Sequence, residues 1–193
     1  MKRYLLILIL TFNFQIFTKA DDIRDFEIEG MSVGDSLLDY YSKTEIQNFH
    51  TIYYPNSRKF YQVGTIIESN LYDALNFNLK ADDSEYIIYS IKGLKNVDNQ
   101  LDQCLKQKTN MINQILQIIT DTKEDKFESN FANNFGKSIS YISEFNLYNG
   151  TFHIACSKWD KKNEKIISNG WWDSLNASLG LKVWHDWLNK EAY

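Results

Sequence analysis

The chain has 193 residues and a formal net charge of −4, a length typical of one globular domain with a sizeable core. An acidic chain without a basic stripe argues against binding to a nucleic-acid backbone, so we expect no nucleic-acid partner. The two cysteines form no C-x-x-C motif and no histidine lies at ligand spacing from them, so we expect no metal and no cofactor.

The first 20 residues have the three parts of a secretory signal peptide. Lys2 and Arg3 give a positive start, residues 5–17 give an apolar run too short to span a bilayer, and Ala20 ends a segment suited to cleavage. Cleavage removes three of the 21 basic residues and none of the 25 acidic ones, so the net charge becomes −7. We therefore expect a single mature domain over residues 21–193, periplasmic or secreted, with an uncleaved N-terminal anchor as the alternative.

The mature domain is expected to begin with an extended segment and a helix. Residues 22–29 alternate apolar and charged side chains, which indicates a half-exposed strand or an extended arm. Gly30 lets the backbone turn, and Gly34 allows a close approach of neighbouring chain. Ser32 is expected to cap a first helix that ends or kinks near Tyr41.

A second short helix and three strands follow. Ser42 and Glu45 form a capping box, which predicts a helix through Phe49. Runs rich in Tyr, Ile and Phe, separated by short polar turns, then predict strands joined as antiparallel hairpins. These strands are expected at residues 60–67, 72–80 and 86–92.

The second half of the chain again places strands after a helix. Asp98 is expected to cap a long helix that ends at Ile119, and the polar residues 120–137 predict a surface loop. The Asn149-Gly150 pair between two alternating runs predicts a hairpin. The expected strands are residues 138–148, 151–159 and 171–179, and residues 181–192 predict an amphipathic helix.

This order of elements predicts an α+β domain, because the helices and the antiparallel strands are segregated along the chain. We expect one or more antiparallel sheets, a short N-terminal helix pair, one long central helix and a C-terminal amphipathic helix. The two halves show no internal repeat that can be aligned.

Cys104 and Cys156 are expected to form a disulfide, because an even number of cysteines in an exported chain indicates pairing. Cys104 lies on the apolar stripe of the predicted central helix, and Cys156 lies on the buried side of a predicted strand. Closing a loop of that length would stabilise the fold by roughly 4 kcal/mol in the chain-entropy account. Two separate buried thiols are the alternative.

Two overlapping serine-hydrolase patterns occur near the mature N-terminus. Residues 30–34 match G-x-S-x-G, in which Ser32 would stand at a strand-to-helix turn. That hydrolase fold needs earlier strands to carry a loop that binds the oxyanion, and Ser32 lies too close to the start of the mature chain for such strands. A turn that leads into a helix explains the same residues.

Residues 34–37 match G-D-S-L, the block that carries the nucleophile in the SGNH (GDSL-type) esterases, and this resemblance would make Ser36 the nucleophile. The family's companion motifs are missing, because there is no G-x-N-D block. No Asp stands three residues before His50, His153 or His185. A nucleophilic serine needs a base and a group that orients the base, so we expect no catalysis, with an ester hydrolase as the alternative.

The five tryptophans all lie at or after Trp159. Packing between a C-terminal hairpin and helix explains most of them. Trp171 and Trp172 are adjacent on a predicted strand, so one should face inward and the other outward. The outward indole is the candidate binding aromatic for a sugar or a peptide.

Several segments resemble known groups of proteins. The whole mature chain resembles a group of exported proteins of AT-rich marine alphaproteobacteria, to which no activity is assigned. The segments that carry this resemblance are DIRDFEIEGMSVGDSLLDYY, YDALNFNL, YIIYSIKG and HDWLN. IEGMSVGDSLL is similar to the I-x-x-G-M-T helix start of the small lipoproteins of outer-membrane assembly and of β-lactamase-inhibitor-like domains. This similarity implies a binding module of helix pair and antiparallel sheet. The chain differs from them in its lack of a lipidated Cys and of Gly-x-Pro after the first helix, and in its longer connecting helix.

These features predict a soluble, exported binding or accessory module of the cell envelope. Its partner would be an envelope or extracellular protein, or a glycan. The alternatives are a G-D-S-L ester hydrolase that uses Ser36, and a carbohydrate-binding protein that uses an exposed Trp171 or Trp172.

Overall fold

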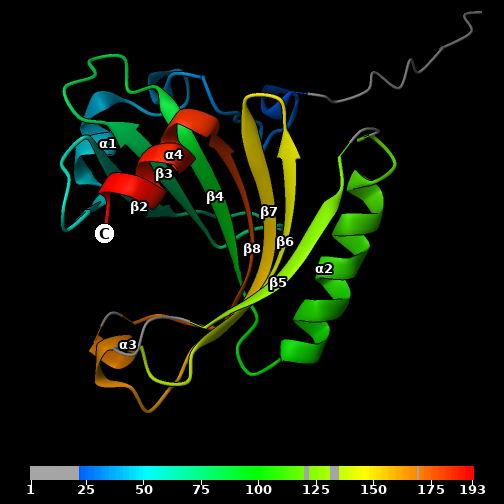
Figure 1. Cartoon of the computed structure of the whole chain (residues 1–193). Helices are drawn as coiled ribbons and strands as arrows, with labels where there is room; N and C mark the ends of the chain where they lie inside the picture. Colours follow the sequence, from blue (N-terminus) through cyan, green and yellow to red (C-terminus); the bar gives the residue numbers. More distant parts are fainter. Residues whose placement is uncertain (1–21, 120–121, 131–134, 169) are drawn as a thin grey trace, which may run out of the picture.

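The computed structural model of the chain describes residues 22–119, 122–130, 135–168 and 170–193. These residues form an eight-stranded antiparallel sheet with the strand order β1-β2-β3-β4-β8-β7-β6-β5 (Figure 1). The strands are β1 (His50–Tyr53), β2 (Phe60–Ile66), β3 (Ala74–Lys80), β4 (Ile88–Asn96), β5 (Glu124–Asn130), β6 (Ile139–Leu147), β7 (Gly150–Lys158) and β8 (Ser174–Leu181). The helices are the 3₁₀ turns η1 (Ile23–Asp25) and η2 (Leu37–Asp39), and α1 (Lys43–Asn48), α2 (Leu101–Ile115), α3 (Glu164–Ser168) and α4 (Lys182–Glu191). The expected signal peptide lies outside the described residues.

The sheet consists of two runs of four strands, with α2 between them in the chain. Strands β1 to β4 are paired in sequence order, and so are β5 to β8. The two runs meet where β4 pairs with β8, so that Ile91 lies opposite Leu179 and Lys92 lies opposite Ser178. This mixed fold, which is mostly antiparallel sheet, is compatible with the α+β class expected from the sequence.

Apolar and polar side chains alternate along the strands, which gives the sheet one apolar face and one polar face. In β3, Leu75 and Phe77 are buried in the core, whereas Asn76 and Asn78 point to the other side, because successive side chains of a strand point to opposite faces. The apolar face consists of Val63, Leu75, Phe77, Leu79, Ile91, Phe145, Phe152, Ile154, Cys156, Leu175, Ala177 and Leu179. Each fully buried side chain of this kind contributes about 1.5–3 kcal/mol.

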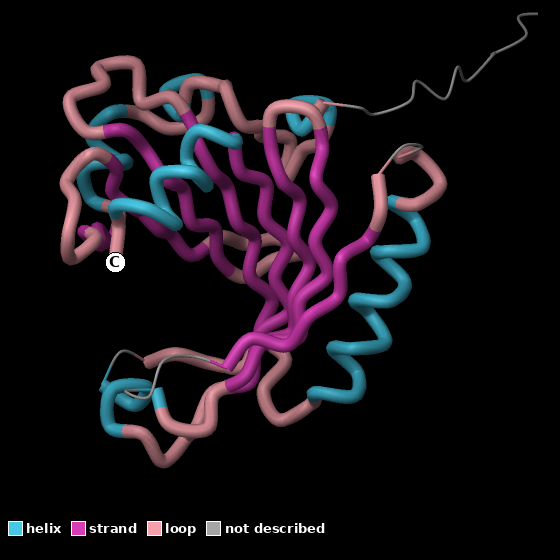
Figure 2. Tube along the Cα trace, in the orientation of Figure 1, coloured by secondary structure: helices cyan, strands magenta, loops and turns pink. Residues whose placement is uncertain are grey.

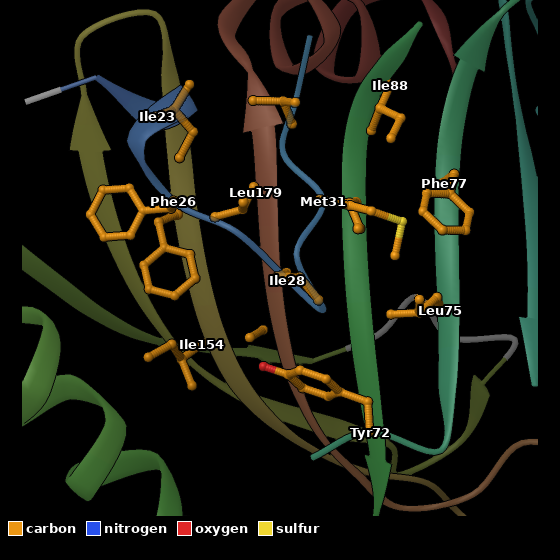
Figure 3. Packing of buried hydrophobic residues seen from close by; sticks show 14 of the residues in the cluster. Ile23, Phe26, Ile28, Met31, Tyr72, Leu75, Phe77, Ile88, Ile154 and Leu179 are labelled. Atoms are coloured by element: carbon orange, nitrogen blue, oxygen red, sulfur yellow. The ribbon is translucent and has the colours of Figure 1, made fainter. Parts of the chain in front are cut away.

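Two segments cover the apolar face. The N-terminal residues 22–41 lie across the strands, and Figure 3 shows their apolar side chains directed at the sheet: Ile23, Phe26, Ile28 and Met31. Helix α2 covers the part formed by β7 and β8. The Sγ atoms of Cys104 on α2 and Cys156 on β7, which were expected to pair, lie at the bonding distance of 2.06 Å. The disulfide therefore fastens α2 to the sheet.

The N-terminal segment begins with the 3₁₀ turn η1 and continues as an extended stretch with a tight turn in it, so only part of residues 22–29 is the extended arm expected from the sequence. Glu29 and Gly30 have positive φ angles of 53° and 75°. Ile28 and Met31 exchange two backbone hydrogen bonds around them. A tight turn of this kind needs φ above zero at both central residues, a conformation that glycine adopts without strain. The first glycine of the G-x-S-x-G pattern therefore shapes the backbone.

Helix α2 differs from the prediction at both ends. It begins at Leu101, no side chain caps it, and it ends at Ile115. The prediction that Asp98 caps this helix is wrong. Asn99 takes a φ of 56° and redirects the chain before the first turn, and the Asp98 carboxylate pairs with Lys161 at 3.3 Å. The capping box predicted before α1 is present.

The sequence reading missed the two edge strands of the sheet. Residues 120–137 were expected to be a loop, and this is wrong for residues 124–130, which form β5 and pair with β6. Strand β1 pairs with β2 at the other edge and is exposed along its whole length. Edge strands pair on one side only. Strand β5 has a polar, loop-like composition, and β1 has only four residues, so neither gives a clear strand pattern.

Strands β6 and β7 form the predicted hairpin. Leu147 lies opposite Gly150, so the turn residues are Tyr148 and Asn149, one position earlier than predicted. Asn149 has a φ of 67°, which Asn tolerates in such a turn. No helix in the described part of the chain is long and apolar enough to cross a membrane.

The polar face is covered at its two ends. At one end, α4 packs Trp184 and Trp187 into a small cluster with Phe60 and Tyr54. At the other end lie α3 and the segments around it (Figure 1). Figure 2 shows α2 on one side of the sheet, with α4 and α3 on the other. The middle of the polar face lies between these two covers.

Candidate functional site

A cleft of about 900 Å³ lies over the polar face. Its floor is the middle of the sheet, and one wall includes Tyr53, Tyr54 and the C-terminal Tyr193. The residues of the opposite wall come from the α3 end: Phe135, Trp159, Lys165, Trp171 and Trp172. This volume lies within the range of about 300–1,000 Å³ that small-molecule sites occupy.

The cleft has an unusual charge composition. None of the described residues that line it is Asp or Glu, although the chain has 25 acidic residues. The basic or protonatable residues in the lining are His50, Lys92, His153 and Lys165. In a molecule of net negative charge, the cleft is thus a local region that favours an anion over a cation.

The strand register places a row of polar side chains across the floor. Asn76, Lys92, Ser178 and His153 are successive partners on β3, β4, β8 and β7. Glu144 continues the row on β6. Directly opposite residues in neighbouring strands have Cβ atoms about 4.5–5.5 Å apart, so these side chains form a continuous line across the sheet.

Lys92 stands in the middle of this row without an ion-pair partner. On the other face of the same strand, Lys95 pairs with Asp73 at 3.0 Å, whereas Lys92 makes no salt bridge with any described residue. Its side chain is half-buried: it opens to the cleft and protein surrounds its other sides. This removal from water lowers the pKa of Lys92, because desolvation penalises the charged form. A bound anion would supply the missing partner.

Two neutral histidines lie at one end of the row: His153, which belongs to it, and His185 on α4. The rings of His153 and of His185 on α4 lie 5.2 Å apart between centroids. Burial is the main cause that lowers the pKa of each to about 4, and the charge of Lys92 adds to it. Oε2 of Glu144 lies 2.7 Å from Nε2 of His153, yet this nitrogen forms no hydrogen bond with the described residues. The contact is therefore too poorly aligned to offset the effect of burial on the pKa of His153. Both rings are uncharged at neutral pH.

The polar side chains of the floor fall into two groups. Some bond to each other, as do the hydroxyls of Ser140 and Ser157 at 3.0 Å. Gln62, Asn76 and Ser178 are half-buried and line the cleft, and their side chains form no hydrogen bond with the described residues. These amide and hydroxyl groups are available to a ligand.

An aromatic cluster forms the wall at the α3 end. The ring centroids of Trp159 and Trp171 lie 4.7 Å apart, and those of Phe135 and Trp171 lie 5.5 Å apart. Trp171 and Trp172 were expected on a strand with one indole inward and one outward. They precede β8 instead, and the Asp173 carboxylate that follows them accepts a hydrogen bond from the Trp159 backbone at the end of β7. Both indoles are half-buried in the cleft wall.

The residues of the hydrolase patterns lie away from this cleft, in the segment that covers the apolar face. Ser36 caps η2 by accepting a hydrogen bond from the backbone of Leu38, and its hydroxyl donates to the Glu85 carbonyl at 2.6 Å. No histidine of the described residues bonds to Ser36.

Ser32 does not cap a helix, contrary to the expectation. Its hydroxyl donates to the Arg24 carbonyl at 3.2 Å. Gly34, with a φ of 95°, continues the turn beyond Ser32, so the helical turn that follows, η2, starts later and is capped by Ser36. Ser32, Gly34 and Ser36 therefore all shape the backbone of the segment that covers the apolar face.

A second hollow, of about 640 Å³, lies beside α4. Its basic residues are largely neutralised, because Lys59 pairs with Glu191 and Lys182 pairs with Asp186. This pairing distinguishes the hollow from the cleft, whose central lysine has no such partner. We therefore take the cleft over the polar face as the candidate site.

Sequence reasoning missed the floor of the site. Asn76 and Lys92 occupy alternate positions of two predicted strands, a pattern that indicates a solvent-facing side and does not distinguish open solvent from a cleft. Ser178 joins them through the pairing of β4 with β8, which are remote in the chain. The predicted strand ended at Lys92, whereas β4 continues to Asn96 and places this lysine at an inner position of the sheet.

No group of three or more His, Cys, Asp or Glu in the described part of the chain could hold a metal ion. The chemistry that the cleft offers is hydrogen bonding, charge pairing and aromatic contact. No protein-family model, no curated protein and no solved structure matches the chain.

Proposed function

We propose that the chain is an exported binding protein that holds a small-molecule ligand in the cleft over the polar face. The observation that supports this most directly is Lys92, a partly desolvated cation without a partner among the described residues, next to Asn76 and Ser178 with unused hydrogen-bonding groups. Polar groups removed from water are costly unless they are paired. A ligand that pairs them gains this free energy on binding.

Export is the second part of the proposal. It is supported by the signal-peptide pattern of the first 20 residues, and by the pairing of Cys104 with Cys156, since disulfides persist in oxidising compartments. The protein would act in the periplasm or outside the cell, as an accessory or binding module.

A variant that fills the cleft tests the binding proposal. Ser178 points into the cleft from the middle of its floor, so Ser178→Phe would occupy the ligand's space. A library of small polar and acidic compounds would be screened by ligand-observed NMR against the wild type and this variant. Gln103→Phe, on the exposed side of α2, is the matched control.

The proposal expects compounds that bind the wild type and Gln103→Phe and lose their signals with Ser178→Phe. Binding that persists in Ser178→Phe would contradict it, as would a library in which no compound binds the wild type. Thermal unfolding of both variants would show that they are folded.

A further inference from the structure

We infer that the ligand of this cleft is a hydroxyl-rich anion, namely a saccharide that carries a carboxylate or a phosphate. The inference rests on the proposed binding function and names the chemical class of its ligand. Four features of the cleft lead to it: its charge, its floor, its wall and its size.

The charge of the lining selects an anion. Lys92 projects from the floor and Lys165 lies in the wall, and none of the described lining residues has a carboxylate side chain. Glu144, the acid at the end of the polar row, contacts His153 and does not line the cleft. A compact ammonium such as that of Lys92 pairs with a carboxylate or a phosphate as a point charge.

The floor selects a ligand with many hydroxyl groups. Besides the polar row, whose Asn76 and Ser178 have unused hydrogen-bonding groups, a line of four serines on β5 to β8 borders the cleft, and two of them, Ser140 and Ser157, also bond to each other: Ser129, Ser140, Ser157 and Ser174. Amides and hydroxyls both donate and accept hydrogen bonds, as do sugar hydroxyls. A fatty acid would instead need a continuous apolar floor for its chain, and the aliphatic side chains that the strands contribute to the described lining are Ile52 at the β1 edge, Leu94, Ile142 and Ala155.

The wall and the size suit sugar rings. A pyranose has faces of C–H groups that pack on flat aromatic rings, and Trp159 and Trp171 present half-buried indoles at the cleft wall. The volume of about 900 Å³ is more than one ring fills, so an oligosaccharide can lie from the aromatic wall to Lys92. The acidic group would then sit over the polar row.

Isothermal titration calorimetry with four defined probes tests this inference. Digalacturonate and glucose 6-phosphate carry the two anionic groups, maltose is a neutral saccharide, and decanoate is an anion with an acyl chain. We expect at least one acidic saccharide to bind at least tenfold more tightly than maltose and decanoate. The stronger of the two acidic probes identifies the carboxylate or the phosphate as the natural group.

Substitutions on the two faces of β4 provide the matched comparison. Lys92→Gln should weaken binding of the acidic saccharide at least tenfold and leave the affinity for maltose unchanged. Lys92→Arg, which keeps the charge, should retain part of the affinity. Lys95→Gln removes a lysine from the same strand on the opposite face and should change neither affinity.

The outcomes separate the ligand class from the binding function. Equal affinity for maltose and the acidic saccharides, or no effect of Lys92→Gln, would overturn the inference. Tight binding of decanoate that Ser178→Phe abolishes would also overturn it, while leaving the proposed cleft binding in place. If no probe binds and the compound library also fails, both proposals are wrong.

Discussion

The two faces of β3 and β4 differ in what covers them. Phe77 and Ile91 point to the apolar face and are fully buried under the N-terminal segment. Their neighbours Asn76 and Lys92 point to the other face and line a cleft. One face therefore supplies the burial that stabilises the fold, and the other can carry groups that are unfavourable for stability. Binding sites commonly combine local cost with stability from elsewhere.

The largest effect should come from truncating a side chain on the apolar face. Phe77 is 0% exposed, so Phe77→Ala should lower the free energy of unfolding by about 3–5 kcal/mol, through lost burial and a cavity. Asn76→Ala, one residue away on the polar face, should change it by about 0.5 kcal/mol or less. Urea denaturation of both variants measures the contrast. Equal losses would mean that both faces contribute to the core.

Removal of the disulfide that fastens α2 should have the next largest effect on stability. It joins residues 52 positions apart, so replacing Cys104 and Cys156 by Ala should cost about 2–4 kcal/mol, largely through the freedom gained by the unfolded chain. Denaturation of the variant, and of the wild type with and without reductant, measures this cost. A reductant that changes the wild type but not the variant confirms the cause. An unchanged unfolding midpoint would contradict it.

Mild acid should lower the stability of the protein through two histidines on the polar face, His153 and His185. The pKa values of His153 and His185 fall from 6.5 to about 4 in the folded chain, so the unfolded chain binds more protons between these values. Stability should therefore fall as the pH drops from about 6.5 to 4, by about 3 kcal/mol for both rings together after allowance for their remaining water contact. Other groups near the rings are Lys92, Glu144 and Asp186.

Equilibrium unfolding across this pH range measures the effect. A variant with both histidines replaced by Gln should lose most of the slope above pH 4.5. If the variant keeps the wild-type slope, another group titrates in this range and the assignment to the histidines is wrong.

The hydroxyl of Ser36 should contribute less. It caps η2 and bonds to the Glu85 carbonyl, which helps hold the covering segment over the apolar face. Ser36→Ala should cost about 1 kcal/mol. Ser84→Ala, at an exposed position nearby, should cost almost nothing by the same thermal-unfolding measurement. A stability loss no larger than that of the control would show that this contact does not hold the segment.

The smallest effect should have the opposite sign. Lys92→Leu removes a partly desolvated charge without a described partner, so the ligand-free protein should gain about 0.5–1 kcal/mol. The unfolding temperature would rise by about 2–4 °C per kcal/mol for a chain of this size. Lys95→Leu, which breaks an ion pair, should give no gain. Destabilisation by Lys92→Leu would show that the lysine supports the fold.

The elements that the sequence predicted well are those with local signals. The Ser42–Glu45 box before α1 and the hairpin at Asn149 are specified by residues within a few positions of each other. The pairing of Cys104 with Cys156 also agreed with the expectation, since both lie on apolar stripes.

The elements that it missed depend on distant contacts. The edge strand β5 has a loop-like composition and is ordered by its pairing with β6. The cleft needs Lys92 beside Ser178, and this register arises from two strands whose own sequences do not indicate a partner. Trp171 and Trp172 were recognised as candidate aromatics, but they precede β8, and Trp171 packs against Phe135 and Trp159, which come from other segments of the chain.

The pairing of β4 with β8 also has a consequence for how the protein folds. It is the join between the two runs of strands, and contacts between segments so far apart in the chain form slowly, because a long loop must close first. Each run can assemble from local hairpins before that step. The centre of the binding surface would then be the last part of the sheet to mature, after the C-terminal strand has reached its place.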